Sequence, residues 1–82
     1  MADVVLSREI ARQYTDGETR VAVEAVTMRS IVRELDERFP GIGKVLGEGM
    51  AVAIDGTIFQ DFFLEEVRPD SEVCFLPAIE GG

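Results

Sequence analysis

Histidine is absent from this sequence of 82 residues, and cysteine occurs only once, as Cys74. Without histidine, the chain lacks the usual general base, the usual partner of a nucleophilic serine or cysteine, and the commonest transition-metal ligand. A single cysteine excludes a disulfide within the chain. Any chemistry that the protein takes part in must therefore depend on something other than a conventional side-chain site.

Long apolar runs are also missing. None approaches the roughly 20 residues that cross a bilayer, and residues 1–6 lack the basic start and long apolar stretch of a signal peptide. We therefore expect a cytoplasmic protein that does not enter a membrane. The length and the hydrophobic content of 46% fit one small globular domain.

Basic residues are scarce in the second half of the chain. Arg68 is the only one after Lys44, and the whole sequence has a net charge of −8. An acidic surface repels nucleic acid and anionic lipid, and it favours a basic protein partner. The alternative is an ordinary solvated acidic surface, so the asymmetry matters only if the C-terminal half is the part that docks.

The hydrophobic pattern predicts strands and one main helix. Strands are expected over residues 3–8, 18–24, 50–54, 57–59 and 72–76, where apolar residues alternate or cluster. The helix is expected over residues 28–39, with Thr27 as its N-cap and Pro40 at its end. Residues 9–17 are interpreted as a connection, residues 42–49 as a single helical turn, and Asp55-Gly56 as a tight hairpin turn.

This order of elements predicts an α+β fold of the β-grasp (ubiquitin-like) type, with a mixed sheet of four to five strands packed on one main helix. The domain is expected over residues 1–77 and a flexible C-terminal tail over residues 78–82. Alternation in the last strand places Val73 and Phe75 toward the helix. Cys74 and Leu76 are then expected on the exposed sheet face, beside the tail.

The tail ends in two glycines, Gly81 and Gly82. Because glycine has no Cβ, its backbone can approach another surface closely. A narrow channel on a partner would admit these two residues and exclude bulkier ones, so the terminal carboxylate would be the group that reaches a reactive centre. Here the two glycines follow a predicted β-grasp domain, its last strand and Pro77. In this position they predict a functional tail.

Residues 52–56, residues 64–73 and above all residues 75–82 resemble the ubiquitin-like sulfur carriers typified by the molybdopterin-synthase small subunit and the thiamine-pathway carrier (MoaD/ThiS-like). The resemblance covers nearly the whole chain. It implies a carrier protein rather than an enzyme, whose Gly82 carboxylate is adenylated by an E1-like enzyme (MoeB/ThiF-like) with ATP and Mg²⁺. A sulfur donor then converts the acyl-adenylate to a thiocarboxylate, and the carrier itself is expected to bind no cofactor and no metal.

The exposed sheet face and the tail are also where partners are expected to bind, the alternative being that Leu76 simply covers sheet surface. The reactive end is expected at Gly81 and Gly82, and the partner contacts are expected at Leu76, Pro77, Ala78, Ile79 and Glu80. Cys74 is interpreted as a small packing residue, because no adjacent cation would stabilise a reactive thiolate. Acidic residues in the loop before the last strand are interpreted as solvated rather than catalytic; these are Glu65, Glu66 and Asp70.

Several functions remain open at this point. The favoured acceptor is the molybdopterin-synthase large subunit, because the connection between helix and strand is longer than a minimal thiamine carrier would need. A carrier for cysteine, thiamine or another metabolite uses the same ending. A ubiquitin-like protein modifier would use the same activated Gly82, and a passive β-grasp interaction module would not use it at all.

Overall fold

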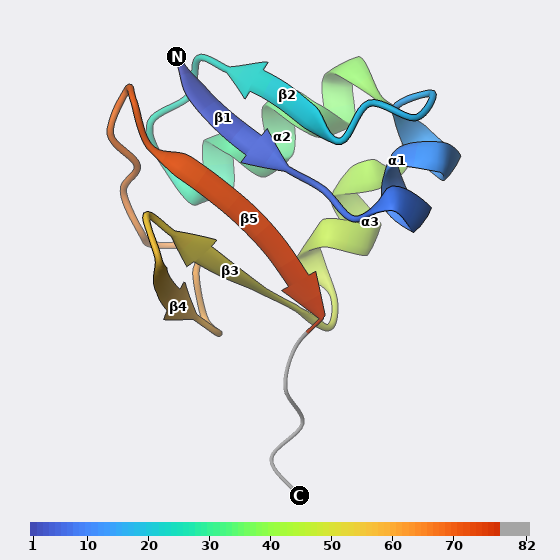
Figure 1. Cartoon of the computed structure of the whole chain (residues 1–82). Coiled ribbons are helices and arrows are strands. Elements are labelled where there is room, and N and C mark those ends of the chain that lie inside the picture. The colour runs from blue at the N-terminus through green and yellow to red at the C-terminus, as the bar shows by residue number, and fades with distance from the viewer. Residues whose placement is uncertain (78–82) are drawn as a thin grey trace, which may run out of the picture.

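The structure is a computed structural model that describes residues 1–77 (Figure 1). Its strands are β1 (Ala2–Val5), β2 (Arg20–Val23), β3 (Met50–Ile54), β4 (Thr57–Phe59) and β5 (Glu72–Pro77). Its helices are α1 (Arg8–Tyr14), α2 (Met28–Arg38) and α3 (Ile42–Gly47). No helix within residues 1–77 is long and apolar enough to cross a membrane.

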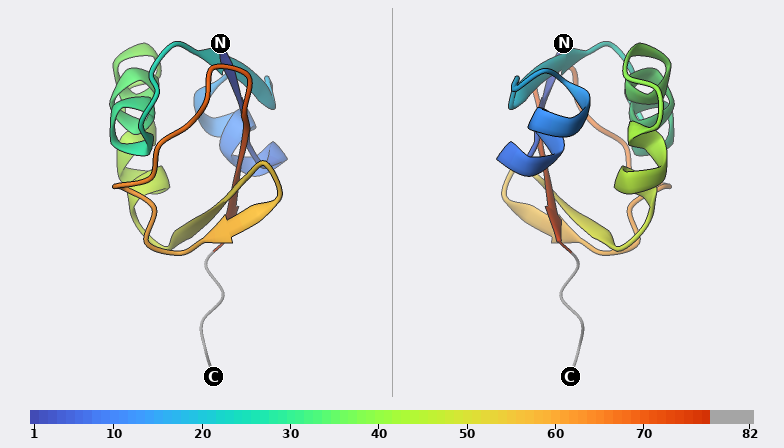
Figure 2. Two further views of the ribbon diagram at one scale, coloured as in Figure 1. Left: turned by 90° about the vertical axis from the view of Figure 1, so that its left-hand side faces the viewer. Right: turned by 90° about the vertical axis from the view of Figure 1, so that its right-hand side faces the viewer.

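The five strands form one mixed sheet in the order β2-β1-β5-β3-β4. Strand β5 lies in the centre, parallel to β1 and antiparallel to β3, and the β1–β2 and β3–β4 pairs are antiparallel. Helices α2 and α3 lie over one face of this sheet, and α1 lies near the end of β1 (Figures 1 and 2). The ubiquitin-like β-grasp fold predicted from the sequence is confirmed.

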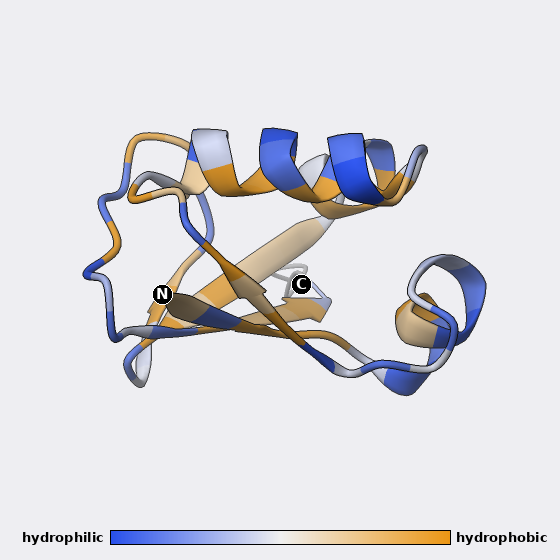
Figure 3. Cartoon of the chain, turned by 90° about the horizontal axis from the view of Figure 1, so that it is seen from above, coloured by the Kyte–Doolittle hydropathy of each residue, from blue (hydrophilic) through white to orange (hydrophobic). Residues whose placement is uncertain are grey.

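Helix α2 begins and packs as its sequence indicates. The Thr27 hydroxyl oxygen accepts a hydrogen bond from the backbone N–H of Ser30, which is the expected N-cap contact. Its apolar stripe faces the sheet, and Met28, Ile31 and Leu35 are fully buried (Figure 3). This stripe and the inward residues of the strands form the core between helix and sheet.

The predicted connection at residues 9–17 is wrong, because most of it forms helix α1. The Ser7 side chain accepts a hydrogen bond from the N–H of Ile10, at 3.2 Å, and so caps the helix. Ile10 and Ala11 are buried and attach this short helix to the rest of the domain. The first strand consequently ends at Val5, whereas the sequence predicted that it would extend to residue 8.

Helix α3 lies where the sequence predicts a single helical turn, at residues 42–49, and it follows directly after α2. The Asp36 carboxylate accepts hydrogen bonds from the N–H groups of Gly41 and Gly43, at 3.2 and 2.9 Å, and so holds the start of α3 against the end of α2. A Cβ at position 43 would lie 2.9 Å from Asp36 Oδ1, so only glycine fits there without a shift. Because α3 contributes Ile42 and Leu46 to the core, the cover of the sheet does not rest on α2 alone.

Candidate functional site

Strand β5 is the element that leads to the predicted tail. Its burial alternates along the strand: Val73 and Phe75 are buried on the helix side, whereas Cys74 and Leu76 are half-buried on the other side. The strand runs one residue beyond the prediction, because Pro77 is its last residue and lies opposite Met50. Since β5 is hydrogen-bonded to β1 and β3 on its two sides, its direction at Pro77 is fixed by the whole sheet.

The sheet face away from α2 and α3 carries an apolar surface around Leu76. Cross-strand partners share a face of a sheet, and the register places Leu76 opposite Ala51 and Cys74 opposite both Val5 and Ala53. Ala53 in turn lies opposite Ile58, which is 55% exposed. We call this surface the outer-face patch; its exposed or half-buried members are Val5, Ala53, Ile58, Cys74 and Leu76, and Ala51 on the same face is buried.

A charged corner borders the outer-face patch on β1, β2 and β5. The Arg20 guanidinium lies 3.0 Å from the Glu72 carboxylate and 3.7 Å from that of Asp3. Because these side chains are more than half exposed, their ion pairs contribute only about 0–1 kcal/mol each to stability. Two carboxylates against one guanidinium leave this corner acidic, which fits a partner with basic groups beside an apolar docking surface.

Asp55 anchors the beginning of β5 to the β3–β4 turn. Its carboxylate accepts hydrogen bonds from the Ser71 hydroxyl, at 2.6 Å, and from the backbone N–H of Glu72, at 2.9 Å. The N–H of Asp55 donates to the Glu72 carbonyl at 3.0 Å. The pKa of Asp55 is lowered from its ordinary value, first by the Ser71 hydroxyl and then by the Glu72 N–H. This contact fixes the end of β5 that lies far from the tail.

We predict that Asp55→Asn destabilises the protein at neutral pH and that the difference from the wild type shrinks in acid. A carboxyl group with a lowered pKa in the folded state contributes stability above its unfolded pKa and loses it as the pH falls through the folded pKa. The gap should therefore begin to narrow below about pH 4 and close as the pH falls through the lowered pKa of Asp55, as measured by thermal unfolding across the acid range. Asp61→Asn, at an exposed site, is the control. Parallel acid profiles for the wild type and Asp55→Asn would contradict this role.

Of the predicted site residues, the structure describes Leu76 and Pro77. Leu76 is half-buried within the outer-face patch, and Pro77 is exposed at the end of β5. The predicted contacts Ala78, Ile79 and Glu80 and the predicted reactive end at Gly81 and Gly82 lie outside the described residues. Their roles stay predictions.

Other candidate groups do not come together. Cys74 is half-buried between Val5 and Ala53, in the middle of the outer-face patch. Glu65 is half-buried and Glu66 is exposed, in the loop between β4 and β5. Within residues 1–77, no group of three or more cysteine or acidic side chains is arranged to hold a metal ion.

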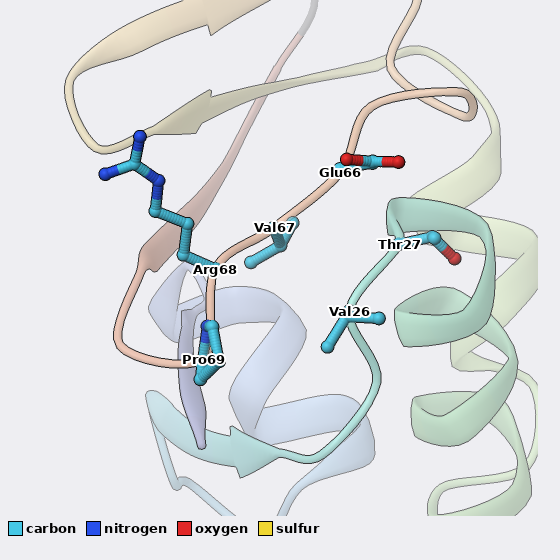
Figure 4. Close-up of a pocket in the computed structure, with 6 residues that line it drawn as sticks. All are labelled: Val26, Thr27, Glu66, Val67, Arg68 and Pro69. Atoms are coloured by element: carbon cyan, nitrogen blue, oxygen red, sulfur yellow. The ribbon is translucent and has the colours of Figure 1, made fainter.

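One open pocket, which the sequence did not indicate, lies beside the start of α2 (Figure 4). It has a volume of about 530 Å³ and an apolar wall of Val26, Val67 and Pro69. The charged end of Arg68 extends away from Val26 and Val67, toward the β3–β4 hairpin (Figure 4). Ligand sites generally need polar groups that converge on the bound molecule. We therefore place the candidate site at the outer-face patch and not at this pocket.

A β-grasp domain whose central strand ends beside an apolar sheet face defines a ubiquitin-like protein. The ThiS family model matches residues 6–82, and the chain belongs to the ThiS family. It is thus a small sulfur carrier of the ThiS/MoaD type. A comparison with curated protein sequences finds no significant match.

Two solved structures share the fold over nearly their full length. The crystal structure of the Amycolatopsis orientalis BexX/CysO complex contains a chain with 24% identity and a TM-score of 0.83, with 100% of both chains covered. The Mycobacterium tuberculosis CysO structure, described as an antigen, has 16% identity and a TM-score of 0.84, with 96% of this chain and 100% of that chain covered. The first match shows that a protein of this fold has been crystallised in a complex with a partner.

Proposed function

We propose that the Gly82 carboxylate is the group that carries sulfur. An E1-like enzyme of the MoeB/ThiF kind would use ATP and Mg²⁺ to form an acyl-adenylate at Gly82, releasing pyrophosphate. A donor of sulfur at the oxidation level of sulfide would then displace AMP, so that sulfur takes the place of one carboxylate oxygen. A free carboxylate is a poor acyl donor, whereas the adenylate provides a good leaving group.

The observation that carries this proposal is the family match, which extends through the final Gly81-Gly82 pair. The described part of the chain supports it, because β5 is the central strand and leads directly into residues 78–82. In this proposal the carrier supplies position, and the partner supplies phosphate binding and electrostatic stabilisation.

The outer-face patch would bind the activating enzyme. Leu76 and Ile58 offer apolar contact area on this face, and Pro77 lies exposed at the end of β5, next to the tail. Ala78, Ile79 and Glu80 are proposed to continue the contact into the partner's channel. The acidic corner at Arg20, Asp3 and Glu72 would orient a basic partner, because rim charges mainly affect association rate and register.

The acceptor of the sulfur is the finer part of the proposal. A molybdopterin-synthase large subunit remains the acceptor that the sequence favoured. Sulfur transfer to it would take place in the cytoplasm. The two solved relatives are both CysO proteins, which favours the other option left open by the sequence, a carrier for cysteine or another metabolite. Assays with candidate acceptors should therefore test both kinds of recipient.

Deleting Gly82 tests the proposed function. We expect complete loss of sulfur loading, because the terminal carboxylate would then belong to Gly81 and lie one residue short of the position it reaches in the wild type. The circular dichroism spectrum should stay unchanged. The measurement is intact-protein mass spectrometry of untagged protein from the native host, where sulfur replaces one oxygen at the wild-type terminus. Gln13→Ala, an exposed position on α1, should load normally.

The same measurement separates the remaining alternatives. Branched conjugates on lysine amines, without a sulfur-for-oxygen exchange, would favour a protein modifier. Full biological activity after deletion of Gly82 would contradict both readings of the activated tail and leave a passive interaction module.

A further inference from the structure

Among residues 1–77, strand β2 is an edge strand of the sheet, with β1 on one side only. In its antiparallel pairing with β1, Val4 lies opposite Val21, and the N–H of Leu6 donates to the carbonyl of Thr19. Residues that exchange hydrogen bonds alternate with residues that do not. The N–H and C=O groups of Arg20, Ala22 and Glu24 therefore point away from β1, toward the free edge.

Two side chains from α2 occupy this edge. The Arg38 guanidinium donates a hydrogen bond to the Ala22 carbonyl at 2.7 Å. The two Glu34 carboxylate oxygens accept from the N–H of Glu24 at 3.1 and 3.2 Å, and one of them also accepts from the N–H of Ala25 at 3.1 Å. Arg38 and Glu34 lie 3.5 Å apart as an ion pair on the same helix face. Together they take the place of a neighbouring strand at two of the outward backbone groups.

The free edge is also complementary to itself. If β2 of a second copy paired antiparallel with Ala22 opposite Ala22, Arg20 of each copy would lie opposite Glu24 of the other. All three outward-pointing residues would then exchange backbone hydrogen bonds, and each cross-strand pair of charged side chains would be of opposite sign. Such a contact is isologous, which is the commonest geometry of homodimers.

We propose that β2 is a self-association edge that Glu34 and Arg38 keep closed, with a second copy of this chain as its occupant once they are removed. Exposed edge strands are templates for pairing with another chain, and natural proteins protect them with charges or by covering them. Here a helix that packs on the sheet supplies the protecting side chains. The carrier therefore stays a single copy, and its outer-face patch stays free of this contact.

The test is the double variant Glu34→Ala/Arg38→Ala, studied as the full chain by analytical ultracentrifugation over a range of concentrations. We expect the wild type to remain a monomer of 9.0 kDa and the variant to approach twice that mass as its concentration rises. Amide NMR shifts that change with concentration should cluster at residues 20–24. The matched control is Arg33→Ala/Glu37→Ala, which removes the same charges from exposed positions of α2 and should stay monomeric.

A folded double variant that stays monomeric at every concentration would overturn the proposal, as would shift changes confined to the outer-face patch. Should the double variant fail to fold, Glu34→Met/Arg38→Met keeps unbranched side chains at both positions but removes the acceptor for the Glu24 N–H and the donor to the Ala22 carbonyl. Dimer formation by this variant supports the closed edge, and a monomer refutes it. In the wild type, amide exchange at Glu24 and Ala25 as fast as at Ala22 would also refute it.

Discussion

Leu76→Asp should abolish activation of the carrier while leaving its fold intact. Leu76 lies on the outer-face patch, on the strand that leads to the tail. In an apolar interface an unpaired carboxylate costs about 3 kcal/mol or more, which corresponds to at least about a hundredfold loss of affinity. On the half-exposed outer face of the free protein the same change should cost only about 1 kcal/mol. The measurement is pyrophosphate release by the activating enzyme as carrier concentration is varied.

Leu64→Asp is the matched control. Leu64 is 90% exposed in the loop between β4 and β5 and does not belong to the outer-face patch. The two variants carry the same added charge, so a general effect of acidity on a basic partner would weaken both equally. If Leu64→Asp impairs activation as much as Leu76→Asp does, the docking surface lies elsewhere.

The sequence predicts the fold well where a pattern is long or has a distinct chemical signal. Helix α2 has a capping threonine and an apolar stripe over three turns, and both are found as predicted. The Asp55-Gly56 turn is recognisable because both residues need positive φ, and the structure has 49° and 89° there. The short helices are harder, because α1 has only 7 residues and isolated helices of that length are unstable without tertiary contacts. The signal for α1 was Ser7 as a cap, followed by Ile10 and Ala11 as buried residues.

Some features of the candidate site were likewise predictable from the sequence, and others were not. Period-two alternation placed Cys74 and Leu76 on the outer face, and the structure has them there. The partners that complete that face, such as Val5 and Ile58, depend on strand order, which a single sequence does not specify. The sequence also does not indicate contacts between a side chain and backbone groups that lie far from it along the chain. Glu34 and Arg38 look like an ordinary surface pair four residues apart, yet they contact the backbone of β2.

Phe75→Ala should disrupt the fold, whereas Leu76→Asp should leave the fold intact, although the two positions are neighbours on β5. Phe75 is 2% exposed, and its ring meets the Phe62 ring edge-on, with centroids 5.8 Å apart. Removing a buried phenylalanine costs about 3–5 kcal/mol, against a total stability of about 4–12 kcal/mol for a chain of this length. We therefore expect the variant to be largely unfolded or to unfold at far lower urea concentration, as followed by circular dichroism.

Phe63→Ala provides the comparison for this last experiment. The Phe63 ring also stacks on Phe62, with centroids 5.1 Å apart, but Phe63 is 39% exposed. The loss should stay below about 1.5 kcal/mol, because the substitution leaves no buried cavity. Equal destabilisation by the two variants would mean that the aromatic cluster, and not the inward face of β5, holds the central strand against the helices.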